Sequence, residues 1–217
     1  MEEKRMTDLR GNIFIEGPAG RIEAIIKESE NPVARCAIIC HPHPLYGGTM
    51  HNKVVFRIAR AFQDAGFSVL RFNFRGTGLS EGKYDDGVGE QDDLRAAVRF
   101  MGEKHPNAAL WIAGFSFGAA VMLRALDCDE PLQAFVGAGV PFSKYDFTKI
   151  THCNKPKLFV QGERDEFGSP EELKRWVDTF DEPKELTIIP AADHFFDGHL
   201  SELQQCISDF IARYGSK

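Results

Sequence analysis

Short apolar runs alternate with amphipathic segments along most of this chain. The runs are typical of strands that are buried on both faces of a sheet, and they predict strands at 34–40, 67–72, 109–113, 134–138, 157–161 and 185–190. Between the runs, apolar residues recur every three or four positions, which is the period of one helix face. This spacing predicts helices at 54–65, 88–101, 117–126, 169–180 and 200–214.

The order of these elements predicts the architecture. Strands that alternate with helices from residue 34 onward require a mostly parallel sheet, covered on both faces by right-handed crossovers. Before them, 12–16 and 22–27 alternate apolar and polar residues around a Gly-Pro-Ala-Gly turn, which predicts an antiparallel hairpin. Ser169 and Glu172 form a capping box that marks a helix start. The 217 residues fit a single α/β domain over 1–217.

Composition narrows the class of protein rather than its activity. The formal net charge is −6 and there is no basic block, so a nucleic-acid partner has no electrostatic support. No apolar run approaches the ~18 residues of a membrane span, and the charged first residues do not resemble a signal peptide. We therefore expect a cytoplasmic protein with no membrane partner. The odd number of cysteines, without metal-type spacing, predicts reduced thiols at Cys36, Cys40, Cys128, Cys153 and Cys206.

One segment, 109–126, combines a strand, a very tight turn and a helix. Ser116 stands at the apex, in Gly114-Phe115-Ser116-Phe117-Gly118. The pattern G-x-S-x-G between a strand and a helix is the nucleophile elbow, which exposes a serine hydroxyl above a sheet. The glycines are expected because neighbouring backbone comes too close to tolerate a β-carbon. The five letters also occur in ordinary glycine-rich turns, so the flanking strand and helix carry the interpretation.

Two later strands are followed by residues that would activate such a serine. Functional groups of an open parallel sheet gather at the carboxyl ends of its strands, where this chain places Ser116, then Asp165, then His194. A serine hydroxyl needs a base to take its proton, and an imidazole oriented by a carboxylate is such a base. We predict Ser116 as the nucleophile, His194 as the general base and Asp165 as the orienting acid.

Neighbouring residues offer alternatives for two of these roles. Asp165 could be an ordinary turn aspartate, with Glu163 or Glu166 as the acid. Asp193 is a weaker candidate, because a residue adjacent to His194 in sequence usually points elsewhere. His194 competes with six other histidines, and its position just past the final strand singles it out.

The same chemistry requires an oxyanion hole, which is built from two backbone N–H groups. Phe117, which follows the predicted nucleophile, should supply one of them. The loop after strand 34–40 should supply the other. Two residues of its His-Pro-His-Pro sequence are prolines without an N–H, so Leu45 is preferred, with His43 or Tyr46 as alternatives. Aromatic residues around the site predict an apolar substrate pocket lined by Tyr46, Phe142, Phe167 and Phe195.

Two other kinds of ligand site are disfavoured by the residues present. His41, His43 and His51 lie close in sequence, but no nearby Asp, Glu or Cys completes a metal-ligand spacing, so no metal is expected. The glycine-rich segment 73–82 resembles a phosphate-cradling loop, yet it lacks the G-K-[ST] and the spacing of a P-loop. We interpret that segment as structure beneath the active site.

Taken together, these motifs resemble the α/β-hydrolase superfamily from about residue 12 to the end of the chain. GFSFG, GERD and DHFF follow its order of serine, acid and histidine. HPHPLYGGTMHNKVV, RFNFRGTGLSEG and ADHFFDG are similar to a group of small lidless bacterial hydrolases, described as predicted carboxylesterases or dienelactone-hydrolase-like proteins. The resemblance implies an α/β-hydrolase fold with a mostly parallel central sheet, helices on both faces and no cap domain.

The chain departs from the family pattern at three places. His-Pro-His-Pro stands where many relatives have His-Gly, which leaves the second oxyanion donor open. The segment 139–155, where relatives often insert a helical cap, is short, so the site should be open and shallow. Position 116 is serine where dienelactone hydrolases have cysteine, which favours plain ester hydrolysis.

The expected activity is therefore hydrolysis of small to medium carboxylic esters through an acyl-enzyme, with no cofactor. Thioester or amide hydrolysis on the same triad is an alternative, and so is a non-catalytic binding protein that has kept the fold. The expected partner is a small-molecule ester. The sequence leaves open the physiological ester and whether the protein forms a homodimer.

Overall fold

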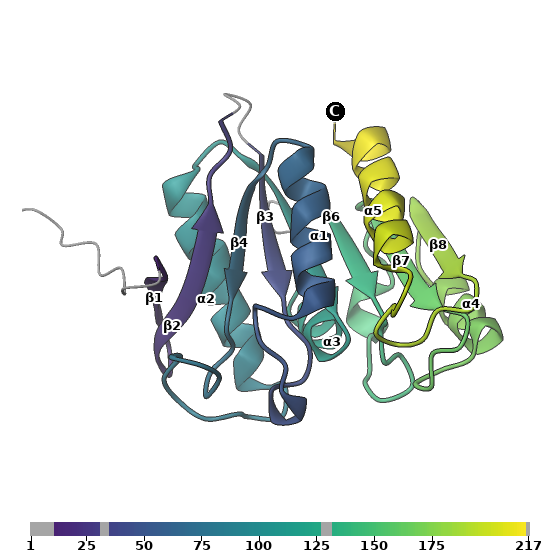
Figure 1. Cartoon of the computed structure of the whole chain (residues 1–217), viewed down its shortest axis with the longest axis horizontal. Helices are drawn as coiled ribbons and strands as arrows, with labels where there is room; N and C mark the ends of the chain where they lie inside the picture. The colour runs from purple at the N-terminus through teal and green to yellow at the C-terminus, as the bar shows by residue number, and fades with distance from the viewer. Residues whose placement is uncertain (1–10, 31–34, 127–131, 216–217) are drawn as a thin grey trace, which may run out of the picture.

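Eight strands form one sheet in the computed structural model, which describes residues 11–30, 35–126 and 132–215 (Figure 1). Their order is β1-β2-β4-β3-β5-β6-β7-β8. The first two strands pair antiparallel with each other, and β2 pairs antiparallel with β4, whereas all later pairs are parallel. The strands are β1 (Ile13–Gly17), β2 (Gly20–Lys27), β3 (Arg35–Cys40), β4 (Ser68–Phe72), β5 (Ala109–Phe115), β6 (Leu132–Ala138), β7 (Lys157–Gly162) and β8 (Lys184–Ile189). The predicted hairpin and parallel sheet are confirmed.

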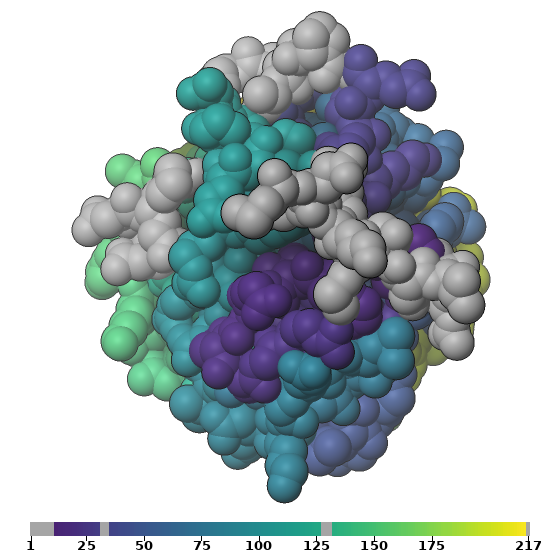
Figure 2. All heavy atoms as spheres, turned by 90° about the vertical axis from the view of Figure 1, so that its left-hand side faces the viewer, coloured from purple at the N-terminus to yellow at the C-terminus, as the bar shows by residue number. Residues whose placement is uncertain are grey.

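Helices cover both faces of this sheet, as the strand–helix alternation predicts. In Figure 1, α1 (Lys53–Asp64) and α5 (Leu200–Tyr214) lie in front of the strands, and α2 (Gly89–Lys104) and α3 (Phe117–Ala125) lie behind them. The face behind also receives α4 (Pro170–Asp178), whose buried Leu173 and Val177 join the same apolar cluster as α2 and α3. Figure 2, which views the molecule from the left-hand side of Figure 1, shows the β1–β2 hairpin facing the viewer, beside α2.

The core consists of two apolar layers because the central strands are buried on both faces. Neighbouring residues of β3 illustrate this, since Ile38 packs into the cluster on the α2–α3 side and Ile39 into the cluster under α1 and α5. Trp111 of β5 is fully buried in the second cluster, where its ring meets Phe62 and Phe210 edge to face. Truncating such a ring typically costs about 3–5 kcal/mol of stability.

Several local predictions can be compared directly with the structure. The capping box at Ser169 and Glu172 is confirmed, with both reciprocal hydrogen bonds present at the start of α4. Among the described residues, no helix is both long enough and apolar enough to cross a membrane. The cysteine prediction is wrong at one position, because Cys153 is disulfide-bonded, whereas Cys36, Cys40 and Cys206 are free. The fifth cysteine, Cys128, lies outside the described residues.

The parallel strands deliver their carboxyl ends to a single edge of the sheet. This edge is the lower one in Figure 1, where the arrowheads point. The loops after β3, β5, β7 and β8 therefore meet there, together with the short 3-10 turn η1 (Pro44–Tyr46). A second 3-10 turn, η2 (Thr148–Ile150), lies between β6 and β7. The predicted Ser116, Asp165 and His194 lie directly after β5 or on the loops after β7 and β8.

Candidate active site

The turn between β5 and α3 has the backbone geometry of a strained elbow. Ser116 adopts φ 55° and ψ −121°, a conformation that non-glycine residues rarely occupy. A β-carbon at Gly114 would lie 2.6 Å from the backbone of Ala119, and one at Gly118 would lie 2.5 Å from the carbonyl oxygen of His41. Both glycines are therefore required by close backbone packing, as the motif predicts. The second contact also fixes the loop after β3 against the start of α3.

The side chains of Asp165, His194 and Ser116 form one hydrogen-bonded chain. His194 Nδ1 lies 2.8 Å from Asp165 Oδ2, and His194 Nε2 lies 2.9 Å from Ser116 Oγ. The carboxylate can only accept, so Nδ1–H donates to it, which leaves Nε2 free to accept from the serine hydroxyl. The side chains of Asp165 and His194 are 0% and 4% exposed, so solvent hardly competes for these bonds.

Asp165 is held by two further donors that come from the β7 strand and the loop after it. Gln161 Nε2 donates to Oδ2 at 2.7 Å, and the backbone N–H of Phe167 donates to Oδ1 at 2.9 Å. Because both oxygens are engaged and buried, the carboxylate is fixed in position and its charge is compensated by hydrogen bonds. Gln161 has no sequence signal of its own beyond its place at the end of a buried strand.

The alternative acids lie elsewhere. Glu163 is exposed and accepts the backbone N–H of Ala191, and Asp193 accepts the N–H of Asp197. Glu166 is exposed to solvent. None of the three is within hydrogen-bond distance of His194 in the described chain, so the geometry favours Asp165 as the partner of the imidazole.

Of the two backbone N–H groups predicted for an oxyanion hole, that of Phe117 has no hydrogen-bond partner in the described ranges and that of Leu45 has one. Phe117 is the first residue of α3, and its N–H has no hydrogen-bond partner within the described ranges. The Leu45 N–H donates to His43 Nδ1 at 3.3 Å, and Leu45 does not line the cavity at Ser116. Of the two alternatives, Tyr46 donates its N–H to the His43 carbonyl, whereas the His43 N–H has no partner among the described residues. The structure therefore favours His43 over Leu45.

His41 occupies a different place in the same loop. Its Nε2 accepts the backbone N–H of Phe74 at 3.0 Å, so its Nδ1–H donates to the Pro42 carbonyl at 2.6 Å. The side chain is fully buried, and burial lowers the pKa of His41 to about 4. The Nε2 bond joins the ends of β3 and β4, and the Nδ1 bond stays within the loop after β3. Over the part of the chain that the structure describes, no group of three or more metal-ligating side chains is present.

A second hydrogen-bonded chain begins at His43 and runs away from the serine. Because His43 Nδ1 accepts from Leu45, its Nε2 carries the proton and donates to Tyr84 Oη at 3.1 Å, and the tyrosine hydroxyl donates to Asp86 Oδ1 at 3.0 Å. Burial lowers the pKa of His43, an effect partly opposed by Asp86, and the charge of Lys144 lowers the pKa further. The imidazole is therefore neutral at neutral pH.

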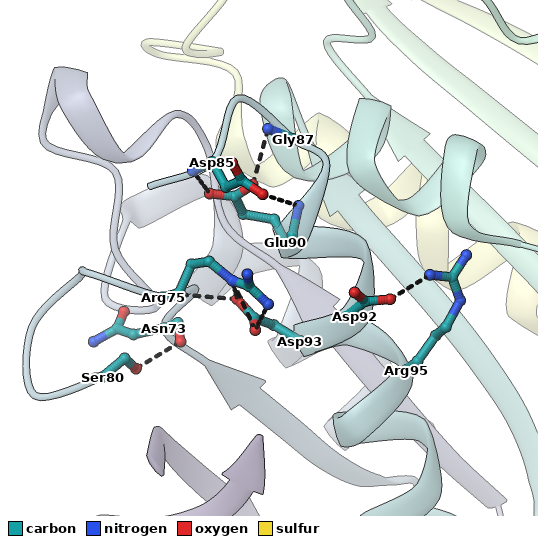
Figure 3. Close-up of polar contacts among 10 residues, drawn as sticks. Asn73, Arg75, Ser80, Asp85, Gly87, Glu90, Asp92, Asp93 and Arg95 are labelled. Carbon is teal, nitrogen blue, oxygen red and sulfur yellow. Dashed lines mark hydrogen bonds and ion pairs between the residues drawn. The ribbon is translucent and has the colours of Figure 1, made fainter. Parts of the chain in front are cut away.

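Tyr84 and Asp86 belong to a segment that is anchored by buried carboxylates (Figure 3). Arg75 makes a bidentate ion pair with Asp93 of α2, with N···O distances of 2.7 to 3.1 Å. The fully buried Glu90 accepts the N–H groups of Asp85 and Gly87, both at 2.8 Å. These contacts fix the segment from Arg75 to Glu90 at both ends. Residues 73–82 therefore act as structure beneath the site, as predicted.

A cavity of about 390 Å³ opens beside Ser116 and His194. The predicted Tyr46, Phe167 and Phe195 line it, and Tyr46 and Phe195 are 87% and 44% exposed, so the cavity reaches solvent. The prediction for Phe142 is wrong. Its ring stacks on the ring of Trp176, with centroids 5.8 Å apart, and it does not line the cavity. Sequence reasoning missed further lining residues, which are Pro42, Gly47, Gly48, Asn52, Pro141, Lys144 and Tyr145.

A strained serine on a strand–helix turn, joined through a histidine to a buried aspartate above a parallel sheet, defines the serine hydrolases of the α/β type. Residues 36–208 match the model of the alpha/beta hydrolase domain, and the chain belongs to that family. The expected superfamily and fold are thereby confirmed.

Proteins of known sequence or structure support the same grouping. An uncharacterized protein of Rickettsia prowazekii is 37% identical over 208 residues, which cover 92% of this chain and 87% of that protein. A serine hydrolase without a lid from Xanthomonas campestris shares 38% identity, with a TM-score of 0.86 over 94% of both chains. A serine hydrolase homologue from Coxiella burnetii also shares 38%, with a TM-score of 0.85 over 91% of this chain and 95% of that one.

Proposed function

We propose that this protein hydrolyses small to medium carboxylic esters through an acyl-enzyme on Ser116. The observation that carries the proposal is the hydrogen-bonded chain from Asp165 through His194 to Ser116, next to a cavity that reaches solvent. The His194 imidazole already accepts a hydrogen bond from the Ser116 hydroxyl that it would deprotonate. Its other nitrogen donates to Asp165, which holds the ring in the correct tautomer.

The first half of the reaction follows from these positions. Ser116 Oγ attacks the ester carbonyl carbon while its proton passes to His194 Nε2, and the buried Asp165 stabilises the imidazolium. The negative charge on the carbonyl oxygen is taken by the N–H of Phe117, whose place at the start of α3 adds the positive end of the helix dipole. We assign the second oxyanion N–H to His43, which lines the cavity and has no other partner in the described chain.

The tetrahedral intermediate then collapses, and the C–O bond to the alcohol breaks. His194 returns its proton to the leaving alkoxide, so the alcohol departs neutral and the acyl group stays on Ser116. In the second half, His194 takes a proton from water, the hydroxide attacks the acyl carbon, and the serine leaves with that proton. No metal or organic cofactor takes part in any of these steps.

Substitution of the serine tests the proposal. Ser116→Ala should lower kcat for p-nitrophenyl acetate or butyrate by about 10⁴-fold or more, because loss of the nucleophile removes the acyl-enzyme route. Ser201→Ala, an exposed serine on α5, is the matched control and should keep full activity. Labelling by a fluorophosphonate probe should be lost in the first variant only. If Ser116→Ala turned over these esters at the wild-type rate, the proposal would be wrong.

The expected cytoplasmic location stays a prediction. The disulfide at Cys153 argues against it, because disulfides are rare in reducing compartments. Fractionation of the cells that make the protein is the direct measurement, with activity found in the soluble cytoplasmic fraction as the result that the prediction expects.

A further inference from the structure

The cavity at Ser116 contains one charged group among otherwise apolar and neutral surroundings. Aromatic rings, prolines and glycines make up most of its lining, with the neutral His43 and the amide of Asn52. Within the described part of the chain, Lys144 is the only lysine, arginine or carboxylate residue that lines it. Lys144 follows β6, in the segment where larger relatives carry a cap.

The ammonium of Lys144 is positioned by the ring that packs against the catalytic histidine. Its Nζ lies 4.3 Å from the centroid of the Phe167 ring, which is a cation–π contact. The same ring meets the imidazole of His194 edge to face, with centroids 4.5 Å apart. Since the Phe167 N–H also donates to Asp165, the loop that positions the triad positions the contact surface of the lysine too.

No carboxylate of the described chain compensates this charge. Lys53, Lys104 and Lys184 each pair with an aspartate or glutamate, whereas no described acidic oxygen lies within 4.0 Å of Lys144 Nζ. The nearby Asp86 accepts the hydroxyl of Tyr84 instead. An exposed lysine is ordinarily just a solvated cation, but this one lies on the wall of the reaction cavity and rests on an aromatic ring.

We propose that Lys144 is a specificity residue that binds a carboxylate on the substrate, so that the preferred esters are half-esters of dicarboxylic acids or esters of hydroxy acids. This inference rests on the proposed ester hydrolysis. A chain with a net charge of −6 repels anions at long range, so an anionic substrate needs a local cation in the cavity. A single lysine, without arginine beside it, matches one carboxylate better than a phosphate, which usually engages several donors.

The test compares esters that differ only in charge. Monoethyl succinate, glutarate and adipate are each paired with the neutral ethyl ester in which an isopropyl group replaces the carboxylate, and hydrolysis is followed by pH-stat. The wild type should show a higher kcat/KM for the anionic member of at least one pair, mainly through a lower KM. A second series carries the carboxylate on the alcohol side, and a preference there supports the proposal equally.

Substitution assigns any preference to the lysine. Lys144→Gln should lower the anionic-to-neutral ratio of kcat/KM by about threefold, the size expected for a partly exposed ion pair, and Lys144→Glu should lower it further. Lys149→Gln, an exposed lysine that does not line the cavity, is the control and should keep the wild-type ratio. Added salt should reduce the ratio in the wild type and have little effect on it in Lys144→Gln.

The outcomes separate the two proposals. A wild type that hydrolyses the neutral esters without preferring any anionic partner overturns the role of Lys144 and leaves ester hydrolysis standing. The same conclusion follows if Lys144→Gln keeps the full anionic preference. A wild type that hydrolyses neither kind of ester, and does not react with a fluorophosphonate, overturns the proposed function itself.

Discussion

Two hydrogen-bonded chains of similar composition border the same cavity. Each begins at an aspartate, and each includes a histidine that lines the cavity. One runs from Asp165 to His194 and on to Ser116, and the other runs from Asp86 through Tyr84 to His43. Only the first has the geometry of a general base, so the reason for the difference lies in how each histidine is held.

The difference arises from burial and from the partners of the imidazole nitrogens. The Asp165 side chain is 0% exposed and contacts its histidine directly, whereas Asp86 is exposed and is separated from His43 by a tyrosine. His194 uses Nδ1 as a donor to the carboxylate, which leaves Nε2 as an acceptor facing a hydroxyl. His43 uses Nδ1 as an acceptor for the Leu45 N–H, so its only proton points to Tyr84. A carboxylate near a histidine is therefore not enough to make a base.

The largest expected effect tests the first chain against the second. Asp165→Asn should lower kcat for p-nitrophenyl butyrate by about 10⁴-fold, because an amide stabilises the wrong imidazole tautomer and cannot compensate the imidazolium charge. Asp86→Asn should change kcat by only a few-fold, because Tyr84 can still donate to the amide oxygen. Steady-state kinetics of the two purified variants measure both effects. Equal losses in the two variants would remove the distinction between the chains.

The second prediction, intermediate in size, concerns His41, the third histidine of the region, and the dependence of stability on pH. The unfolded chain binds a proton at His41 below its usual pKa of 6.5, whereas burial keeps the folded imidazole neutral down to about pH 4. Stability should therefore be unaffected by this group above pH 6.5 and fall below it, by about 1.4 kcal/mol per pH unit. Between pH 6.5 and 5 this amounts to about 2 kcal/mol.

Urea unfolding at the two pH values measures that loss. The loss of unfolding free energy should be smaller in His41→Gln, which has no imidazole at this position to titrate. The loss should equal that of the wild type in His152→Gln, because the His152 side chain is 84% exposed. An NMR titration of the His41 ring provides the same test without a substitution. An imidazole that titrates near 6.5 in the folded protein would contradict the prediction.

The smallest effect concerns the second chain as a positioning device for the loop that carries the His43 N–H. Tyr84→Phe removes the acceptor of His43 Nε2–H and should lower kcat about three- to tenfold while KM changes little, since one hydrogen bond contributes about 1 kcal/mol. Tyr214→Phe on α5, at a position that does not line the cavity, is the control and should keep both constants. A rise in KM with unchanged kcat would show that Tyr84 acts on substrate binding instead.

Much of the fold could be predicted because its signals are local. Buried strands of a parallel sheet read as short apolar runs, and the helices between them show one apolar face, so the alternation alone requires crossovers and a common edge for the strand ends. Capping at Ser169 and the hairpin turn before β2 depend on residues a few positions apart, and both were predicted correctly. The exact bounds differ by a few residues, as at α2, which continues to Lys104.

The positions of Ser116, Asp165 and His194 could be anticipated for a related reason. Each directly follows a strand, and parallel strands that share a direction bring the residues after them to one edge of the sheet. Residue type then supplies the chemistry. The sequence by itself therefore determined which strand ends would meet and predicted Ser116, Asp165 and His194 there, with Glu163 or Glu166 left as alternatives for the acid.

Tertiary structure alone decided the residues whose role depends on a partner distant in the chain. Leu45 and His43 are both loop residues with an N–H. They are distinguished by the hydrogen bond from the Leu45 N–H to the imidazole and by the cavity, which His43 lines and Leu45 does not. The sequence places Phe142 in the pocket, but its ring stacks on Trp176 of α4 and does not line the cavity. Lys144 lines the cavity, and Tyr84 and Asp86 are connected to it through His43. All three come from segments without any motif, because side-chain packing and hydrogen bonding between distant loops follow no short-range pattern that a sequence displays.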